Sequence, residues 1–259
     1  MNVISSPHNR HIKLASRLKL RKYRDELELF LVEGKRAVEE ALARPDLLEI
    51  LFVDRDWEEL PPLELVEFPH SYRLESGLMK QVCAADNPQG IAAIMKKPAW
   101  SWTEMVEKRG LLLVLDRITD PGNLGSILRT GWAFGVEGVL LTKGCVDLFS
   151  PKVVRSSMGA ILNVPVFTDI STGQLVKLHE AGYQFLCSDV NEGKSYHQVT
   201  YDGSTVIILG SEGQGVSEEV KKLADQMVII PMKIGVDSLN VASACAIIMA
   251  EAWRQHEEV

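Results

Sequence analysis

Short runs of Val, Ile and Leu alternate with helical stretches along the second half of the chain, and this alternation limits the fold more than any other feature. The apolar runs cover 111–115, 138–141, 164–167, 184–187, 206–209 and 228–230. Strands that are apolar on both faces, separated by helices, predict a parallel sheet covered on both sides. Ligands bind at the carboxyl ends of such strands. We therefore expect an α/β fold with a site in the loops after Leu115, Leu209 and Ile230.

A smaller α/β pattern precedes this region. We predict four strands, at 28–32, 48–53, 65–68 and 90–95. Two helices lie among them, one from Glu33 and one that Ser76 is placed to cap. The stretch around Pro98 breaks the periodicity. We therefore divide the chain into a first domain at 1–97, a linker at 98–109 and a second domain at 110–259.

Charge is distributed unevenly along the chain. The 259 residues carry a formal net charge of −7, which disfavours a nucleic-acid partner if the charge is evenly spread. Residues 1–24, however, contain no Asp or Glu and many basic side chains. Five of these are candidate RNA contacts: Arg10, Lys13, Arg17, Arg21 and Arg24. A solvated helix face and an arm that contacts phosphates both explain the pattern.

The four cysteines lie far apart, and none belongs to a C-x-x-C pair. They predict reduced thiols rather than a zinc site or a disulfide framework, so we expect no metal. No apolar run reaches the roughly 18 residues that a membrane span needs, and the N-terminus lacks a signal-peptide core. We therefore expect no membrane partner and a cytoplasmic location.

The loop after Leu115 has the sequence LDRITDPGNLGSILRT. We expect Asn123 at the start of a helix, where Gly125 lets a partner approach and Arg129 projects about one turn further along. Taken alone, a helix cap and a surface arginine explain this pattern better than a binding site does.

The loop after Leu209 has the sequence GSEGQG. It lacks the Gly-Lys-Ser/Thr of a P-loop, and no strand is followed by G-x-G-x-x-G, so neither a nucleoside triphosphate nor a dinucleotide is favoured. We expect Gly210 to leave space for a ligand beside the bare backbone, and Glu212 to tie the loop down by accepting backbone N–H groups.

The loop after Ile230 leads through Ser238-Leu239-Asn240 into a long helix. Ser238 or Asn240 is placed to cap that helix, and the small residues that follow permit close packing. Helix capping explains these residues when each is considered singly. Two polar loops at neighbouring strand ends, however, favour a shared binding site over unrelated turns.

Considered together, the three loops resemble a known family in order and spacing. The motifs Asn123-x-Gly125-x3-Arg129, Leu209-Gly210-Ser211-Glu212-Gly213-x-Gly215 and Ile230-Pro231-Met232 with Ser238-Leu239-Asn240 are similar to those of the SpoU (TrmH) family of RNA ribose 2′-O-methyltransferases. The segment 151–167 resembles the connecting region of that family, and the resemblance covers residues 110–256. The basic start and 30–42 resemble the substrate-binding domain, similar to ribosomal protein L30e, that precedes the catalytic domain in members acting on ribosomal RNA.

This resemblance implies a fold, a cofactor and a set of site residues. Members use S-adenosylmethionine, form homodimers and fold the C-terminal part through a trefoil knot. Main-chain groups that would hold the cofactor belong to Leu209, Gly210, Ser211, Ile230, Met232 and Leu239. Arg129 corresponds to the catalytic arginine, and the site is completed by Asn123, Glu212, Ser238 and Asn240. We add Arg117 and Arg155 to the candidate RNA contacts.

The chemistry leaves the role of Arg129 open. The pKa of a guanidinium lies above about 12, so it is protonated at neutral pH and is an awkward base for a ribose 2′-OH. We expect Arg129 to clamp the adjacent phosphate while Asn123 orients the hydroxyl, although arginine as the base is the alternative. The separate first domain favours ribosomal RNA as substrate, and we predict 23S ribosomal RNA. A transfer RNA methyltransferase and a non-catalytic RNA-binding or ribosome-assembly protein are the competing hypotheses.

Overall fold

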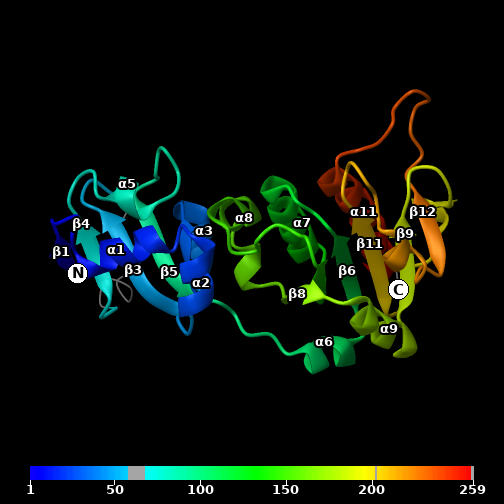
Figure 1. The fold of residues 1–259 in the computed structure, drawn as a ribbon, viewed down its shortest axis with the longest axis horizontal. Coiled ribbons are helices and arrows are strands. Elements are labelled where there is room, and N and C mark those ends of the chain that lie inside the picture. Colours follow the sequence, from blue (N-terminus) through cyan, green and yellow to red (C-terminus); the bar gives the residue numbers. More distant parts are fainter. Residues whose placement is uncertain (58–67, 202, 258–259) are drawn as a thin grey trace. The chain divides into compact units, whose positions relative to one another are not determined.

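The structure is a computed structural model that describes residues 1–57, 68–201 and 203–257. The chain forms two compact units, which are described separately below (Figure 1). The first unit contains Met1–Ala99 together with Asp147–Leu162, and the second contains Trp100–Val146 together with Asn163–Val259. The segment 147–162 thus packs with the first unit although, in sequence, it lies between two segments of the second unit.

The first unit is built on a mixed five-stranded sheet with the order β1-β4-β3-β5-β2. The strands are β1 (Asn2–Ile4), β2 (Leu29–Glu33), β3 (Leu48–Asp54), β4 (Ser71–Leu74) and β5 (Ile91–Lys96). The helices are α1 (Arg10–Arg17), α2 (Arg21–Leu27), α3 (Lys35–Leu42), α5 (Met79–Val82) and α8 (Pro151–Ser157). Strand β5 pairs antiparallel with β2 and β3, whereas β4 pairs parallel with β1 and β3.

The basic N-terminal stretch folds as the two short helices α1 and α2. The Asn9 side chain caps α1 by accepting the His11 N–H at 2.8 Å. Ile12 and Ala15 of α1, followed by Leu18, are buried in the core of the first unit. Because these apolar residues recur at intervals of three, they place the intervening basic side chains on the outer face.

The second unit is built on a parallel seven-stranded sheet with the order β10-β12-β9-β11-β6-β7-β8. The strands are β6 (Leu111–Asp116), β7 (Gly138–Thr142), β8 (Val166–Ile170), β9 (Gln184–Ser188), β10 (Lys194–Ser195), β11 (Thr205–Gly210) and β12 (Gln226–Ile229). The helices are α6 (Trp102–Lys108), α7 (Pro121–Ala133), α9 (Thr172–Glu180), α10 (Glu218–Lys221) and α11 (Val241–Glu257). The predicted parallel α/β sheet is confirmed.

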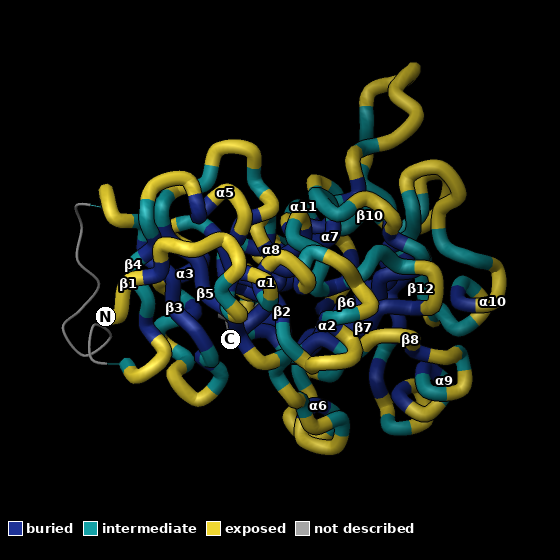
Figure 2. Tube along the Cα trace, turned by 60° about the vertical axis from the view of Figure 1, so that its left-hand side comes forward, coloured by how far each residue is buried: buried dark blue, intermediate teal, exposed yellow. Residues whose placement is uncertain are grey.

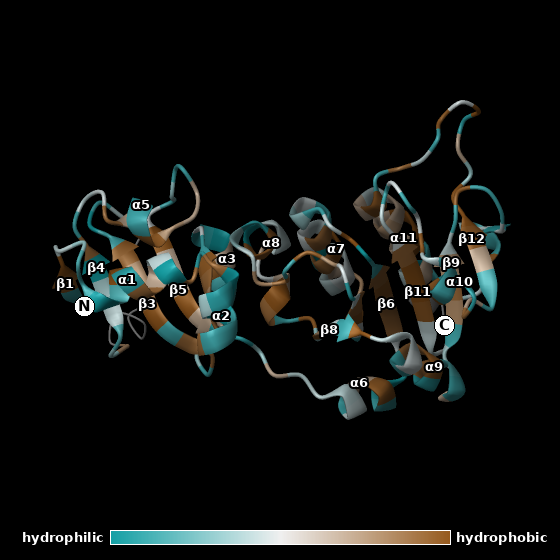
Figure 3. Ribbon diagram, in the orientation of Figure 1, coloured by the Kyte–Doolittle hydropathy of each residue, from teal (hydrophilic) through white to brown (hydrophobic). Residues whose placement is uncertain are grey.

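Alternate residues of the central strands pack on opposite faces of this sheet. Leu112 and Val114 of β6 belong to the same core cluster as Leu175 of α9. Leu113 lies instead beneath α7, where a Cβ at Gly131 would be 3.7 Å from its side chain. Strands β6 and β11 are strongly apolar (Figure 3) and buried, as expected of strands covered on both faces, and β6 lies in the interior of the tube view (Figure 2).

Several local predictions differ from the structure. Residues 65–67 of the strand expected at 65–68 lie outside the described residues, and β4 follows at 71–74 instead. Helix α5 begins at Met79 with Leu78 at the N-cap position, so the predicted cap at Ser76 is wrong. The sequence pattern of 151–162 predicts a single helix, but α8 ends at Ser157, because Met158 has a left-handed φ of 51°, and a 3-10 turn follows at Ala160–Leu162. The stretch expected to be a linker contains α6.

Candidate functional site

A buried carboxylate fixes the loop that follows β11. Asp116, at the end of β6 and opposite Gly210 of β11, is 2% exposed. Its two oxygens accept the Ser217 N–H and the Thr142 hydroxyl, each at 2.7 Å. Burial acts to raise the pKa of Asp116, but these hydrogen bonds outweigh it and hold the pKa below its usual value. The carboxylate therefore pins the returning end of the loop to the strand ends beneath it.

The loop after β11 folds back on itself between Ser211 and Gly215. The Gly215 N–H donates to the Ser211 carbonyl at 2.8 Å, and the two residues form an isolated bridge. A Cβ at Gly210 would lie 2.1 Å from the Gly215 carbonyl carbon. Gly210 is thus required by the backbone of its own loop. The expectation that its missing side chain leaves ligand space is wrong in that respect.

One polar side chain from each of the three predicted loops meets the others. Glu212 accepts hydrogen bonds at a single oxygen, Oε1, from the Asn123 amide at 2.9 Å and the Asn240 amide at 2.6 Å. The Asn240 amide also lies 2.9 Å from the Asn123 carbonyl oxygen, and the Val241 N–H lies 3.4 Å from Glu212. Glu212 therefore joins the first and third loops, rather than only tying down its own loop as expected.

The two asparagines have different positions relative to their helices. Asn240 caps α11 through its side-chain oxygen Oδ1, which accepts the Ala242 and Ser243 N–H groups at 3.0 and 3.3 Å. Of the two predicted caps, Asn240 rather than Ser238 makes these bonds. The cap of α7 is Asp120, which accepts the Asn123 N–H at 2.8 Å, so Asn123 lies in the first turn of the helix, as expected, but does not cap it.

Two adjoining cavities contain the predicted cofactor residues. A cavity of about 440 Å³ is lined by loop 209–216, by Ser238 and Leu239, and by Asp189 and Lys221. A smaller apolar cavity shares Asp189 and Leu239 with it. All six predicted cofactor residues line one or both cavities: Leu209, Gly210, Ser211, Ile230, Met232 and Leu239.

A third cavity, of about 530 Å³, lies on the other side of the loop after β11. It is lined by Arg117, Asp120 and Asn123, and it shares Glu212 and Val241 with the 440 Å³ cavity. The side chain of Arg117 is held beside this cavity by Gln214, whose Oε1 accepts its Nη1 at 3.1 Å. Two binding spaces therefore share one wall, and the Asn123–Glu212–Asn240 cluster lies at that wall.

Arg129 does not join this cluster. It is exposed on α7, six residues after Asn123, which is about 9 Å along a helix axis. It lines none of the three cavities, and among the described residues it forms no ion pair. Within one chain, the structure thus separates the predicted catalytic arginine from the other predicted site residues.

The sequence prediction missed residues contributed by β9. This strand lies between β11 and β12, so the two predicted loops follow strands that are not direct neighbours. Asp189, just after β9, accepts the Lys221 ammonium at 2.6 Å. Burial acts to raise the pKa of Asp189, but the bond from Lys221 contributes to holding it below its usual value. The only sequence signal was a polar residue immediately after an apolar strand.

Four of the five N-terminal cations are exposed: Arg10, Lys13, Arg17 and Arg21. Arg24 differs, because it is 3% exposed, donates to the Leu18 carbonyl at 2.7 Å and pairs with Asp147. Its guanidinium is used inside the first unit, so we remove Arg24 from the candidate RNA contacts. Arg155, also in the first unit, donates to Glu33 at 2.9 Å.

Other candidate chemistry is sparse in the described part of the chain. The four cysteines are free thiols, and burial raises the pKa of Cys187 and Cys245 to about 12, which makes them poor nucleophiles. Among the described residues, no group of three or more His, Cys, Asp or Glu side chains could hold a metal ion. No helix within the described ranges is long and apolar enough to cross a membrane.

Comparisons with known proteins agree with this geometry. The profile of the SpoU rRNA Methylase family matches residues 110–250, and that of the MRM3-like substrate binding domain matches residues 9–93. The 23S rRNA (guanosine(2553)-2′-O)-methyltransferase RlmP of Bacillus subtilis is 32% identical over 96% of this chain and 98% of its own length. An uncharacterized tRNA/rRNA methyltransferase of Synechocystis is 35% identical over 97% and 93%.

Solved structures give the same result. The SpoU methyltransferase AviRb of Streptomyces viridochromogenes, in complex with S-adenosylmethionine, has a TM-score of 0.85 at 27% identity over 97% of this chain and 100% of that one. An S-adenosylmethionine-bound rRNA methyltransferase of Sinorhizobium meliloti has a TM-score of 0.84 at 26% identity over 98% and 97%. With its parallel sheet, its three joined loops and the profile match across 110–250, the chain belongs to the SpoU rRNA methylase family.

Proposed function

We propose that this protein transfers a methyl group from S-adenosylmethionine to a ribose 2′-OH of 23S ribosomal RNA. The observation that carries the proposal is the pair of cavities that meet at the Asn123–Glu212–Asn240 cluster. One cavity suits the methyl donor and the other the acceptor nucleotide. The 23S ribose is proposed because the Bacillus relative, which matches nearly the whole chain, is a 23S rRNA 2′-O-methyltransferase.

The walls of the donor cavity fit S-adenosylmethionine. The adjoining cavity of about 30 Å³ adds the apolar side chains of Val190, Ile230 and Met232, which can contact one edge of an adenine ring held in the larger cavity. The larger cavity is lined by Asp189 and by further carboxylates of α10 and the last loop, Glu218 and Asp237. Negative groups at this end favour the sulfonium and ammonium charges of the donor. When bound, the donor supplies an already activated methyl group.

The residues of the chain have to position the acceptor and manage its proton. We propose that Asn123, whose amide is held by Glu212 and Asn240, orients the ribose in the adjoining cavity. Such fixed geometry contributes to rate because it removes the cost of aligning the reacting atoms. Arg129 is proposed as the phosphate clamp beside the 2′-OH. Arginine as the base stays the alternative.

A homodimer accounts for the separation of Arg129 from its own cluster. We propose that Arg129 reaches the site of a second copy, so that each site is completed across a dimer of catalytic domains. The exposed Trp132 on α7 and Trp253 on α11, each more than a third exposed, support an interface on this pair of packed helices. Aromatic side chains of this size are enriched where subunits meet.

The C-terminal trefoil knot is also a proposal. It is supported by family membership and by the contacts of Gln255 near the end of α11. Its amide oxygen accepts the Tyr201 N–H at 3.0 Å, and its amide nitrogen donates to the Val199 carbonyl at 3.0 Å. The last helix therefore returns to the segment that precedes β11, as a threaded chain requires.

We further propose that residues 1–97 bind the RNA, that 98–109 link the domains and that 110–259 catalyse the transfer. The match to a substrate binding domain over 9–93 supports the first assignment. The proposed RNA contacts are Arg10, Lys13, Arg17, Arg21, Arg117 and Arg155. The cytoplasmic location stays a prediction.

Ligand binding and RNA mapping test the proposal together. S-adenosylmethionine at a hundredfold excess over its dissociation constant should stabilise the folded protein by about 2.7 kcal/mol, whereas NAD or ATP should not. Mapping 2′-O-methyl groups in RNA from cells with and without the protein should show one position in 23S RNA that depends on it. A dependent position in transfer RNA would favour the first competing hypothesis. Donor binding without any dependent position would favour the non-catalytic one.

A further inference from the structure

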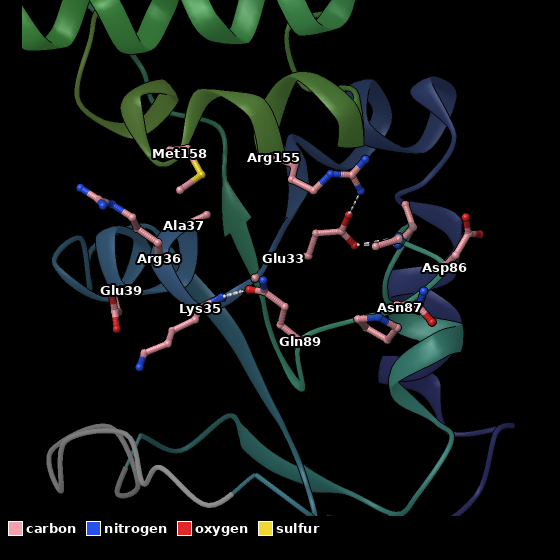
Figure 4. Close-up of a pocket in the computed structure, with 14 residues that line it drawn as sticks. Glu33, Lys35, Arg36, Ala37, Glu39, Asp86, Asn87, Gln89, Arg155 and Met158 are labelled. Carbon is pink, nitrogen blue, oxygen red and sulfur yellow. Dashed lines mark hydrogen bonds and ion pairs between the residues drawn. The ribbon is translucent and has the colours of Figure 1, made fainter.

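The largest cavity among the described pockets lies in the first unit and shares no lining residue with the cavities of the proposed methyl-transfer site. It has a volume of about 640 Å³ and is lined by the turn after β2, by loop 84–89 and by α8 (Figure 4). Cavities of several hundred Å³ are of the size that proteins use for small organic groups. Neither the methyl donor nor the acceptor ribose needs this cavity in the function proposed above.

A buried carboxylate organises this cavity. Glu33, at the end of β2, is 4% exposed, and its Oε2 accepts the Ala84 and Ala85 N–H groups at 2.7 and 3.3 Å. Its Oε1 accepts Arg155 Nη1 at 2.9 Å. One side chain thus connects the floor of the cavity, the loop on one side and the helix on the other (Figure 4). The walls are fixed before any ligand enters.

The contact with Glu33 holds Arg155 in place but occupies only Nη1 of its guanidinium. Its side chain is 49% exposed, and its Nε and Nη2 have no partner among the described residues. The guanidinium plane is therefore oriented by Glu33 while one face and several N–H groups remain open to a ligand. Such an arginine can stack on a base and donate to a phosphate at the same time.

The facing loop contributes amide groups. Gln89 is anchored by the Lys35 N–H, which donates to its Oε1 at 2.9 Å, so its amide nitrogen is left to donate elsewhere. Asn87 is exposed on the same loop and also lines the cavity. Amide side chains that carry both donors and acceptors are suited to the edge of a nucleobase. None of the described residues that line the cavity is aromatic, so we assign the stacking surface to the guanidinium of Arg155.

The charge of the lining favours one nucleotide of a chain over a free polyphosphate. Three cations are balanced by three carboxylates among the lining residues: Lys35, Arg36 and Arg155, and Glu33, Glu39 and Asp86. A triphosphate would need an excess of positive charge. A neutral base with a single phosphate at the rim does not, and unstacked bases of this kind occur in RNA loops and bulges.

We propose that this cavity takes one unstacked nucleotide of the substrate RNA, with its base stacked on Arg155 and its edge read by Asn87 and Gln89. The inference rests on the proposed function for the identity of the partner. Arg155 comes from the segment 147–162, which lies outside the 9–93 match, so the nucleotide site is completed by a part of the chain that matches the methylase.

The first experiment is crosslinking. An in vitro transcript of 23S ribosomal RNA that contains 4-thiouridine is irradiated with the full-length protein, and crosslinked peptides are identified by mass spectrometry. We expect crosslinks in the peptides that contain 84–89 and 155–158. Crosslinks confined to other peptides of the first unit would overturn the proposal.

The second experiment measures steady-state methylation of the same transcript at saturating methyl donor. Arg155→Gln should raise KM for RNA about tenfold, with kcat little changed, because base stacking of this kind contributes about tenfold or more to binding. Glu33→Gln should act in the same direction through the position of Arg155. Asn87→Ala, on an exposed loop that folding does not need, should raise KM by a smaller factor of about three.

A matched control is available in the same unit. Arg55 is an exposed arginine that forms an ion pair with Glu75 at 2.8 Å and does not line the cavity. Arg55→Gln should leave KM for RNA unchanged. An equal rise with Arg55→Gln, or recovery of the normal KM with Arg155→Lys, would show that KM for RNA depends on positive charge alone. Either result would overturn base stacking on Arg155.

The failure of this inference is distinct from failure of the proposed function. If the transcript crosslinks to the cavity peptides but receives no methyl group, the proposed reaction is wrong and the cavity assignment stands. If methyl transfer is normal and Arg155→Gln and Asn87→Ala change neither KM nor the crosslinks, the cavity assignment alone is wrong. The thermal shift with S-adenosylmethionine verifies that each variant is folded.

Discussion

The two units hold their connecting segments in place with different kinds of side-chain interaction. In the first unit, guanidinium groups hold the segment 147–162: Arg24 pairs with Asp147, Arg155 with Glu33, and Arg44 donates to the Leu162 carbonyl at 2.7 Å. In the second unit, the carboxylates that fix the site loops accept hydrogen bonds from neutral donors, although Arg117 also lies 3.4 Å from Asp116 and Asp189 pairs with Lys221. Asp116 accepts a backbone N–H and a hydroxyl, and Glu212 accepts two side-chain amides.

This difference separates what each unit depends on. Removing one partner of a buried ion pair leaves the other charge without compensation, so the first unit depends on its arginines. The donors around Asp116 hold its pKa below the usual value, so the loop that Asp116 fixes depends on its deprotonation. The first unit should therefore be sensitive to arginine substitution and the second to acid.

Arg24→Gln should have the largest effect on stability. It removes the partner of Asp147 inside the first unit, and we expect a loss of about 3–5 kcal/mol in the free energy of unfolding of that unit, measured by urea denaturation. The control is Arg21→Gln, since Arg21 is exposed and within the described residues pairs only with Asp25, and its cost should stay within about 0.5 kcal/mol. Equal costs for the two variants would mean that the buried pair contributes nothing.

Arg129→Ala should lower the rate of methyl transfer and leave stability unchanged. Arg129 is a guanidinium of the second unit without an ion pair in the described part of the chain, so its loss should not destabilise the fold. If it stabilises charge beside the 2′-OH, the single-turnover rate of methyl transfer should fall by about 10²–10³. The melting shift with S-adenosylmethionine should persist. A near-normal rate would remove Arg129 from the proposed site.

Asp116→Asn tests the acid sensitivity of the second unit. The folded pKa of Asp116 lies below its unfolded value of about 3.9, so its stabilisation is present above that pH and is lost as pH falls through the folded pKa. The variant should lose about 1.5–3 kcal/mol at neutral pH. Its stability should also fall less steeply than that of the wild type below about pH 4. Parallel acid limbs would show that Asp116 is not the group responsible.

The smallest effect concerns the exposed cations of α1 and α2. Replacing Lys13, Arg17 and Arg21 together with Gln should reduce the slope of log RNA affinity against log salt by about two to three units, if each contacts a phosphate. Stability should barely change because Gln is nearly as good a helix former. Arg24 is left intact, since its substitution would confuse binding with unfolding. An unchanged slope would identify these residues as a solvated face.

The sequence predicted those features that depend on local pattern. Runs such as 111–115 and 206–209 are apolar throughout, which only a doubly covered sheet requires, and the polar residues after them formed the expected loops. The meeting of Asn123, Glu212 and Asn240 followed from parallel strands that end on one edge. The position of β9 between β11 and β12 could not be predicted in this way, because strand order is set by long-range packing.

Contacts between distant residues were the main omission. Arg24 lies in a basic stretch, and nothing near it in sequence reveals that it pairs with Asp147, which is 123 positions away. Asp116 is likewise recognisable only as a polar residue at the end of an apolar strand. Its role depends on Ser217, 101 positions later. Local periodicity identifies which elements form, but it does not show which loop closes on which strand.

The inclusion of 147–162 in the first unit has a consequence for synthesis of the chain. A domain generally folds as a unit while the ribosome adds residues from the N-terminus. Here the first ninety-nine residues emerge without Asp147 and Arg155, the ionic partners of Arg24 and Glu33, which arrive only after β6, α7 and β7 have been made. Until then Arg24 and Glu33 have only their hydrogen bonds within the N-terminal segment, to the Leu18 carbonyl and from the Ala84 and Ala85 N–H groups. Nascent chains truncated before residue 147 should therefore be cleaved by protease more readily than chains extended beyond residue 162.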